Sequence, residues 1–123
     1  MSTNLIEEKS FRFAVEIVSL YKQLYEKNKE YSLFRQLLRS GTSIGANVKE
    51  GLRGQSKRDF LSKMNIALKE ANETEYWLEL LIKTHYVSEK NKLLKECKEI
   101  CKILSSIVKT TRKNIRIFRL FNV

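Results

Sequence analysis

Apolar residues recur every three or four positions along most of this 123-residue chain, which is the spacing of one face of an α-helix. In the first such stretch Phe11, Ala14 and Val18 follow this period, with Ile17 and Leu24 beside them. Proline is absent and all four glycines lie between positions 41 and 54, so most of the chain lacks the residues that separate short strands. The pattern predicts an all-α protein with four helices, at roughly 10–27, 33–53, 57–85 and 89–118.

The segments that join these predicted helices are short and polar. Ser32 and Ser88 are placed to cap the second and fourth helices, and Ser56 with Asp59 resembles a capping box at the start of the third. Amphipathic helices joined by short connections pack as antiparallel neighbours around a shared core. We therefore predict that residues 1–123 form a single domain, an up-down-up-down antiparallel four-helix bundle.

The glycines lie together in the segment SGTSIGANVKEGLRG, where a phosphate-binding loop is the first possibility to test. A Walker motif needs Lys and then Ser or Thr after its last glycine, but alanine and asparagine follow Gly45, and the dinucleotide motif G-x-G-x-x-G is absent. Gly41 and Gly45 instead share the apolar face of the second helix. We predict that they allow a neighbouring helix to approach closely, since each costs about 1 kcal/mol of helix propensity. Gly51 or Gly54 is expected to form the C-cap of the same helix.

The chain is strongly basic, with 24 Lys and Arg against 14 Asp and Glu and a net charge of +10. Such an excess favours polyanions such as nucleic acid or an anionic membrane surface, and a solvated face that only keeps the protein soluble is the alternative. No acidic residue follows Glu99, where closely spaced cations would form one stripe on a continuing fourth helix. The candidate nucleic-acid-binding residues are this stripe, Lys109, Arg112, Lys113, Arg116 and Arg119, and a second group around the second helix and the turn after it, Arg35, Arg39, Lys49, Arg53, Lys57 and Arg58.

No catalytic or metal-binding set emerges from the other polar residues. The glutamates of the third helix suggest a di-iron site, but that site needs Glu-x-x-His pairs, and the single histidine, His85, has isoleucine three residues before it. Cys97 and Cys101 lie on an apolar stripe, where we predict small core residues rather than zinc ligands. We expect no cofactor, no metal and no enzymatic activity, because a nucleophile with a nearby base is also missing.

Two polar residues interrupt the apolar stripe of the second helix. Glu50 is predicted to be part-buried and therefore paired with a basic residue of another helix or subunit. Asn47 is predicted to join the same structural network, and contact with a ligand is the alternative.

The sequence also predicts where the protein is found. No apolar run reaches the roughly 18 residues of a membrane span, and the first ten residues lack the pattern of a secretory signal. Two cysteines suit a reducing compartment better than a disulfide scaffold, so we expect a cytoplasmic protein.

Two adjoining stretches carry a resemblance to a known family. RSGTSIGANVKEG and SKRDFLSKMNIALKEANETEYWLELL resemble the four-helix bundle proteins that are encoded in intervening sequences of bacterial 23S ribosomal RNA genes, and the resemblance covers residues 11–104. Many members read S-I-P-A-N-I-A-E-G, whereas this chain has Gly45 at the proline and Lys49 at the second alanine. Neither departure changes the predicted fold, and Lys49 adds a charge.

The resemblance also carries expectations about assembly and partners. The family is related to the accessory proteins of diversity-generating retroelements, which are basic, pentameric bundles that bind nucleic acid and a reverse transcriptase. The resemblance therefore implies a cyclic homo-oligomer, a pentamer, with no known enzymatic activity. Three hypotheses stay open: a protein that binds structured RNA or DNA, a scaffold for a partner such as a reverse transcriptase, and a peripheral membrane protein that uses its basic C-terminal helix.

Overall fold

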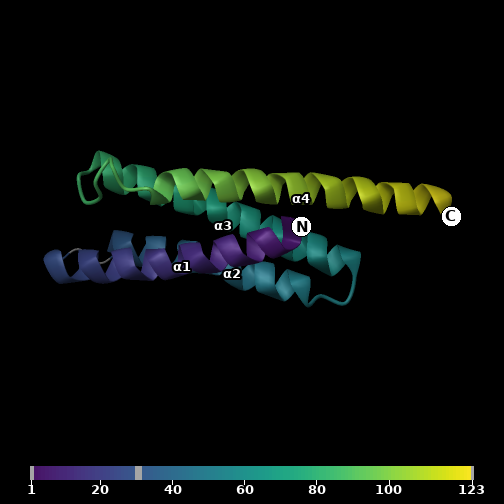
Figure 1. The fold of residues 1–123 in the computed structure, drawn as a ribbon, viewed down its shortest axis with the longest axis horizontal. Coiled ribbons are helices and arrows are strands. Elements are labelled where there is room, and N and C mark those ends of the chain that lie inside the picture. The colour runs from purple at the N-terminus through teal and green to yellow at the C-terminus, as the bar shows by residue number, and fades with distance from the viewer. Residues whose placement is uncertain (1, 30–31, 123) are drawn as a thin grey trace.

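The computed structural model describes residues 2–29 and 32–122, and every regular element in this part of the chain is an α-helix (Figure 1). The helices are α1 (Ser2–Lys27), α2 (Ser32–Leu52), α3 (Lys57–Lys83) and α4 (Leu93–Phe121). Each helix packs against the next one in the sequence, and α4 also packs against α1, while among these residues no close backbone approach joins the diagonal pairs. The prediction of an all-α bundle of four helices is confirmed.

The apolar stripes of the four helices form one core. In α2 the buried apolar side chains include Phe34, Ile44 and Val48, and in α3 they include Met64 and Leu78. The side chains that are fully buried come from every helix, and the largest of them are Phe13, Phe34, Ile6, Ile17, Leu37, Ile44, Met64, Leu78, Leu81, Ile100 and Leu104.

The first helix has two apolar faces, and the prediction chose the wrong one. Phe11 is 71% exposed and Val18 is half-buried, whereas Phe13 and Ile17 are fully buried. The buried face continues toward the N-terminus through Ile6, which also lies in the core. Helix α1 therefore starts well before the predicted position 10, because its first turns have apolar surface to bury.

Helix α4 starts at Leu93 instead of 89, and Ser88 does not cap it. The Oγ atom of Ser88 accepts a hydrogen bond from the backbone N–H of Lys90 at 3.1 Å, inside the loop. The Oδ1 atom of Asn91 accepts one from the backbone N–H of Leu93 at 2.8 Å. These short-range bonds from serine and asparagine hold the loop in turns, so the chain enters the helix later than predicted.

Neither glycine proposed as a C-cap takes that role. Helix α2 runs through Gly51, and no glycine of the described residues has a positive φ. The left-handed residue is His85, with φ of 69°, directly after α3. The N–H of His85 donates to the carbonyl of Ile82 at 3.1 Å, and the N–H of Tyr86 donates to that of Leu81 at 2.9 Å. This pair of bonds is the Schellman arrangement, which satisfies the last carbonyls of the helix.

Gly41 and Gly45 lie where α2 crosses α1. A Cβ atom added to Gly45 would lie 3.2 Å from the carbonyl oxygen of Ser10, and one added to Gly41 would lie 3.0 Å from both γ-carbons of Ile17. Real Cβ atoms rarely come this close to backbone or to branched side-chain atoms. The prediction that these glycines allow a neighbouring helix to approach closely is confirmed.

Candidate nucleic-acid interface

The predicted nucleic-acid-binding residues are all exposed, and they lie in four places along the chain. Arg35 and Arg39 lie in the first half of α2, and Lys49 and Arg53 lie about 20 Å farther along its axis. Lys57 and Arg58 form the first turn of α3. The remaining cations lie on the last part of α4, Lys109, Arg112, Lys113, Arg116 and Arg119.

The last part of α4 extends past the turn between α2 and α3 (Figure 1). We call residues 109–121 the overhang. Its apolar side chains have little to pack against, since Phe118 is 60%, Leu120 is 77% and Phe121 is 83% exposed. The overhang therefore presents large apolar side chains and cations on one helix.

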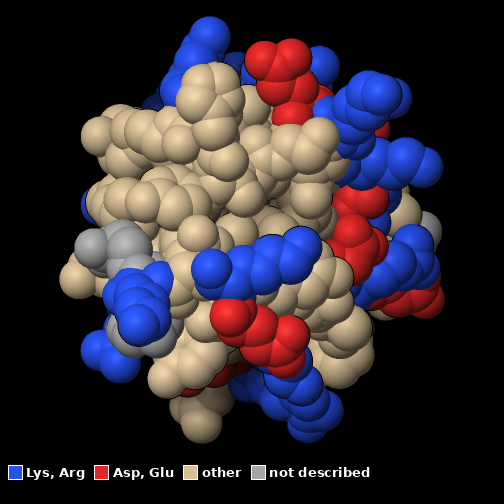
Figure 2. Space-filling view, turned by 90° about the vertical axis from the view of Figure 1, so that its left-hand side faces the viewer, with Lys and Arg blue, Asp and Glu red and all other residues tan. Residues whose placement is uncertain are grey.

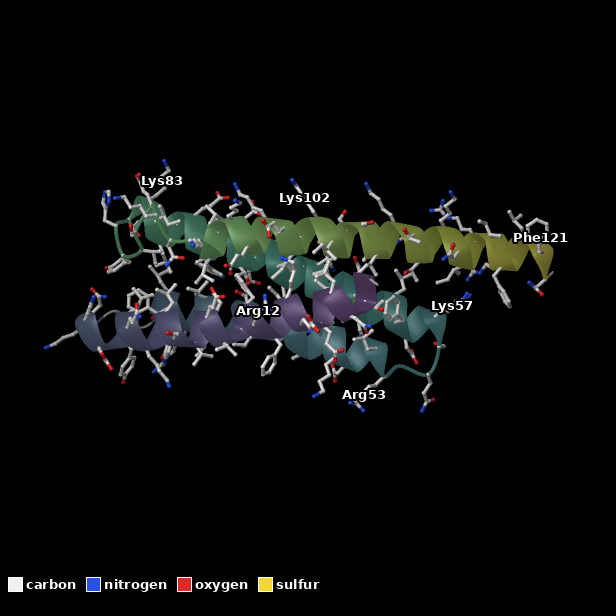
Figure 3. All side chains as sticks on the ribbon, in the orientation of Figure 1. Arg12, Arg53, Lys57, Lys83, Lys102 and Phe121 are labelled. Carbon is white, nitrogen blue, oxygen red and sulfur yellow. The ribbon has the colours of Figure 1, made fainter. Side chains whose placement is uncertain are left out.

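A cleft separates the overhang from the start of α3 and brings two of the predicted groups together. Figure 3 shows Lys57 beneath the overhang, with Arg53 at the end of α2 and Phe121 at the tip of α4. The cleft has a volume of about 400 Å³, and we call it the end cleft; its lining residues are Ser56, Lys57, Arg58, Ile115, Phe118 and Arg119. None of these lining residues is acidic.

The start of α3 is held in place by its cap. The Oγ atom of Ser56 accepts a hydrogen bond from the backbone N–H of Asp59 at 3.1 Å, as predicted from the sequence. The two intervening residues, Lys57 and Arg58, occupy the first two helical positions, whose N–H groups have no partner within a helix. This turn is therefore positive both from its side chains and from the helix terminus.

The cations of the overhang and the end cleft have no carboxylate partner within residues 2–29 and 32–122. The ion pairs in these residues join Lys9 to Glu99, Arg39 to Glu70 and Glu73, and Lys63 to Glu50. Exposed cations without such partners attract counterions from the solvent, and a polyanion can displace these counterions.

Arg39 differs from the other candidates because acidic residues surround it. Its guanidinium binds Glu70 at 3.0 Å and also Glu73, both on α3. The Oε2 atom of Glu73 accepts a further hydrogen bond from Nε1 of Trp77 at 3.0 Å. The bonds from Trp77 and Arg39 lower the pKa of Glu73, and the bond to Glu73 raises the pKa of Arg39. Arg39 thus links α2 to α3, and the structure does not bring it to the end cleft.

The polar residues inside α2 bond within the bundle. Asn47 donates from Nδ2 to the carbonyl of Ser43 at 2.9 Å, within its own helix. Nζ of Lys63, on α3, lies 3.5 Å from Oε2 of Glu50, so the predicted pairing with a basic residue of another helix is confirmed. The predicted burial of Glu50 is wrong, because its side chain is exposed, and such a pair contributes little to stability.

Sequence reasoning missed a groove between α1 and α4. It has a volume of about 360 Å³, and cations of Lys9, Arg12, Lys92 and Lys95 alternate there with carboxylates of Glu16, Glu96 and Glu99. Burial and the nearby carboxylate of Glu16 raise the pKa of Glu96. The nearly balanced charges make this groove a poor surface for a chain of phosphates.

The described residues contain no group of histidine, cysteine and acidic side chains placed to hold a metal ion. Cys97 is buried, and its Sγ donates to the carbonyl of Ala71 at 3.3 Å, as expected for a small core residue. Hydrogen bonding with Cys101 and burial raise the pKa of the Cys97 thiol, so it stays protonated. Within the described part of the chain, none of the helices is apolar over a length that could cross a bilayer.

The family model of the 23S rRNA-intervening sequence protein matches residues 3–106. The chain belongs to this family. A solved structure, described as a protein of unknown function from the S23 ribosomal protein family of Bacteroides thetaiotaomicron VPI-5482, is 53% identical and has a TM-score of 0.85. The match covers 89% of this intervening-sequence protein and 99% of the solved chain. No curated protein sequence matches the chain.

The match to the family ends before the overhang. Residues 109–121 lie beyond the matched range of 3–106, whereas Lys57 and Arg58 lie within it. The end cleft of this intervening-sequence protein therefore joins a family segment to a segment that the family model does not describe.

Proposed function

We propose that this protein binds nucleic acid, structured RNA or DNA, through phosphate contacts and without catalysing a reaction. The observation that supports this best is the set of exposed cations on the overhang and around the end cleft that lack a carboxylate partner in the described residues. Such cations can replace the counterions of a phosphate backbone. Phosphate contacts position a nucleic acid without reading its bases, so we expect binding to tolerate different sequences.

We also propose that the helices follow an up-down-up-down order and that the chain assembles as a cyclic homo-oligomer. Five subunits are the number in the retroelement accessory proteins to which its family is related. Exposed apolar side chains on the outer face of α1 support self-association, since Phe11, Val15 and Tyr25 lie outside the core. A ring would bury part of this surface and repeat the cations around one axis. Sedimentation should give several times the 14.5 kDa of one chain, and a monomer would contradict the ring.

The same surface on α1 favours a second candidate function, that of a scaffold or accessory subunit for a protein such as a reverse transcriptase. Exposed apolar side chains that lie together, as Phe11 and Val15 do one turn apart on α1, commonly mark a contact with another protein. A purified reverse transcriptase that binds the parent protein and not the Phe11→Ser variant would favour this candidate over nucleic-acid binding.

The cationic stripe provides the test of the proposed function. We expect the variant with Lys109, Arg112, Lys113 and Arg116 all changed to Gln to bind a structured RNA more weakly than the parent. Its log affinity should also depend less steeply on log salt, by roughly 0.7 to 0.9 for each phosphate that the variant no longer neutralises.

A charge-preserving variant is the matched control for this test. Exchanging Lys for Arg and Arg for Lys at the same four positions keeps the charge and should keep most of the affinity and the salt slope. A parent that binds neither structured RNA nor DNA at low salt would overturn the proposal. An unchanged slope in the Gln variant would remove the stripe from it.

A further inference from the structure

The end cleft combines two kinds of surface that phosphate binding alone does not need. Lys57, Arg58 and Arg119 supply positive charge, whereas Ile115 and Phe118 supply an apolar wall. Phe118 is 60% exposed, and it is followed directly by Arg119. A volume of about 400 Å³ is that of a small-ligand site, so the cleft can take one flat group beside its cations.

Nucleic-acid bases are flat groups that always have phosphates nearby. In a duplex the bases are stacked inside and cannot reach a side chain at the surface, whereas unpaired bases can stack on an aromatic ring. Proteins that bind single strands combine a positive groove for the backbone with aromatic rings for the bases. The end cleft has both features within one cavity.

We propose that the end cleft binds an unpaired nucleotide of single-stranded nucleic acid, with its base against Phe118 and Ile115. Its flanking phosphates lie against Lys57, Arg58 and Arg119. This inference rests on the proposed function, because it assigns the unpaired part of the same bound nucleic acid to one cavity. It adds a preference for single strands, loops or ends, which a cationic stripe does not provide.

The start of α3 suits the phosphate side of this site. The backbone N–H groups of Lys57 and Arg58 are at the helix terminus, and the cap bond of Ser56 goes to Asp59 instead. A phosphate there meets N–H donors and the positive end of a 27-residue helix. The carboxylate of Asp59 is the one acid of this turn, and Asp59 does not line the cleft.

The test compares a short oligouridylate, which forms no duplex, with an RNA duplex of the same length. We expect Phe118→Ala to weaken oligouridylate binding by about fivefold to a hundredfold, the effect of removing the ring on which one base stacks. Duplex binding and the salt slope should stay unchanged, because every cation is kept. Phe118→Tyr should restore the affinity and Phe118→Leu should not, since leucine keeps apolar volume without a ring.

A second readout follows the ring itself. In a Phe118→Trp variant, oligouridylate should quench the tryptophan fluorescence more than it does in the parent, whose single tryptophan, Trp77, lies on α3. Arg119→Gln should weaken both RNA ligands and flatten the salt slope, which separates the phosphate contact from the stacking contact.

Failure of this inference can be distinguished from failure of the proposed function. A parent that binds both ligands, with Phe118→Ala changing neither, overturns the end-cleft site and leaves the proposed function standing. A parent that binds neither ligand, and no DNA in single-stranded or duplex form, overturns both. If Phe118→Ala instead reduces binding to vesicles of phosphatidylserine and phosphatidylcholine or to polyglutamate, or changes the sedimenting mass, a lipid, an acidic peptide or a second copy occupies the cleft and the assignment is wrong.

Discussion

The two ends of the bundle are finished in different ways. At the closed end, residues 84–92 and the start of α2, the ring of Tyr86 meets that of Phe34 edge-on with centroids 5.3 Å apart, and Val87 is buried. Figure 2 faces this end and shows Lys and Arg side chains interspersed with Asp and Glu. Aromatic packing covers the core here, and on the face shown in Figure 2 basic and acidic side chains lie beside one another around a broad uncharged area.

At the open end, residues 53–58 and the overhang, the large apolar side chains stay exposed. The cations here have no ion-pair partner in the described residues, whereas Arg39, on the flank of the bundle, is held by two carboxylates. The same residue types therefore stabilise the fold at one place and are available to a ligand at another. The comparison predicts that substitutions at the closed end change stability and that substitutions at the open end change binding.

Truncating one phenylalanine at each end is the strongest test of this comparison. We expect Phe34→Ala to lower the free energy of unfolding by about 3–5 kcal/mol, because Phe34 is fully buried and the change leaves a cavity. Phe118→Ala should lower it by less than about 1 kcal/mol, since most of that ring is in solvent. Urea unfolding of both variants gives the two values. Equal decreases would mean that the overhang packs as core.

Removing three positive charges at each end distinguishes the effect of a local surface on RNA binding from the effect of net charge. Changing Lys57, Arg58 and Arg119 to Gln should weaken binding of a structured RNA roughly tenfold or more, because each is placed for a phosphate contact. The matched variant changes three lysines at or next to the closed end to Gln: Lys29 follows α1, Lys83 ends α3 and Lys90 lies in the loop between α3 and α4. It alters net charge equally and should have a much smaller effect. Titrations at one salt concentration compare the two triple variants. Equal weakening would show that binding follows net charge alone.

The sequence predicted most of the fold, because three of the four helices bury one clear stripe. Helix α1 was the exception, since Phe11 and Val15 form an apolar face as regular as that of Phe13 and Ile17. Periodicity shows that a helix has an apolar face, and it cannot choose between two such faces. Only the positions of α2 and α4 decide which one enters the core.

The candidate site was predicted less completely, because its geometry depends on contacts between residues that are far apart in the sequence. The exposed cations were identified from charge and spacing. The carboxylates that hold Arg39 are 31 and 34 residues away, and the end cleft joins Lys57 to Phe118 across half of the chain. No local pattern places residues so far apart in one cavity or one ion pair.

The smallest change in stability is expected at the closed end, where the residue after α3 has a left-handed conformation and is not glycine. His85 takes a left-handed conformation with φ of 69°, which strains a residue with a side chain and suits glycine. We expect His85→Gly to raise the free energy of unfolding by about 0.5–1 kcal/mol, because relief of this strain exceeds the added entropy of the unfolded chain. The matched control is Lys83→Gly, two residues earlier and still helical, which should lower it by about 1 kcal/mol. Thermal unfolding of both variants measures the two changes in stability. A decrease in both would mean that the His85 side chain stabilises the fold by more than its left-handed backbone destabilises it.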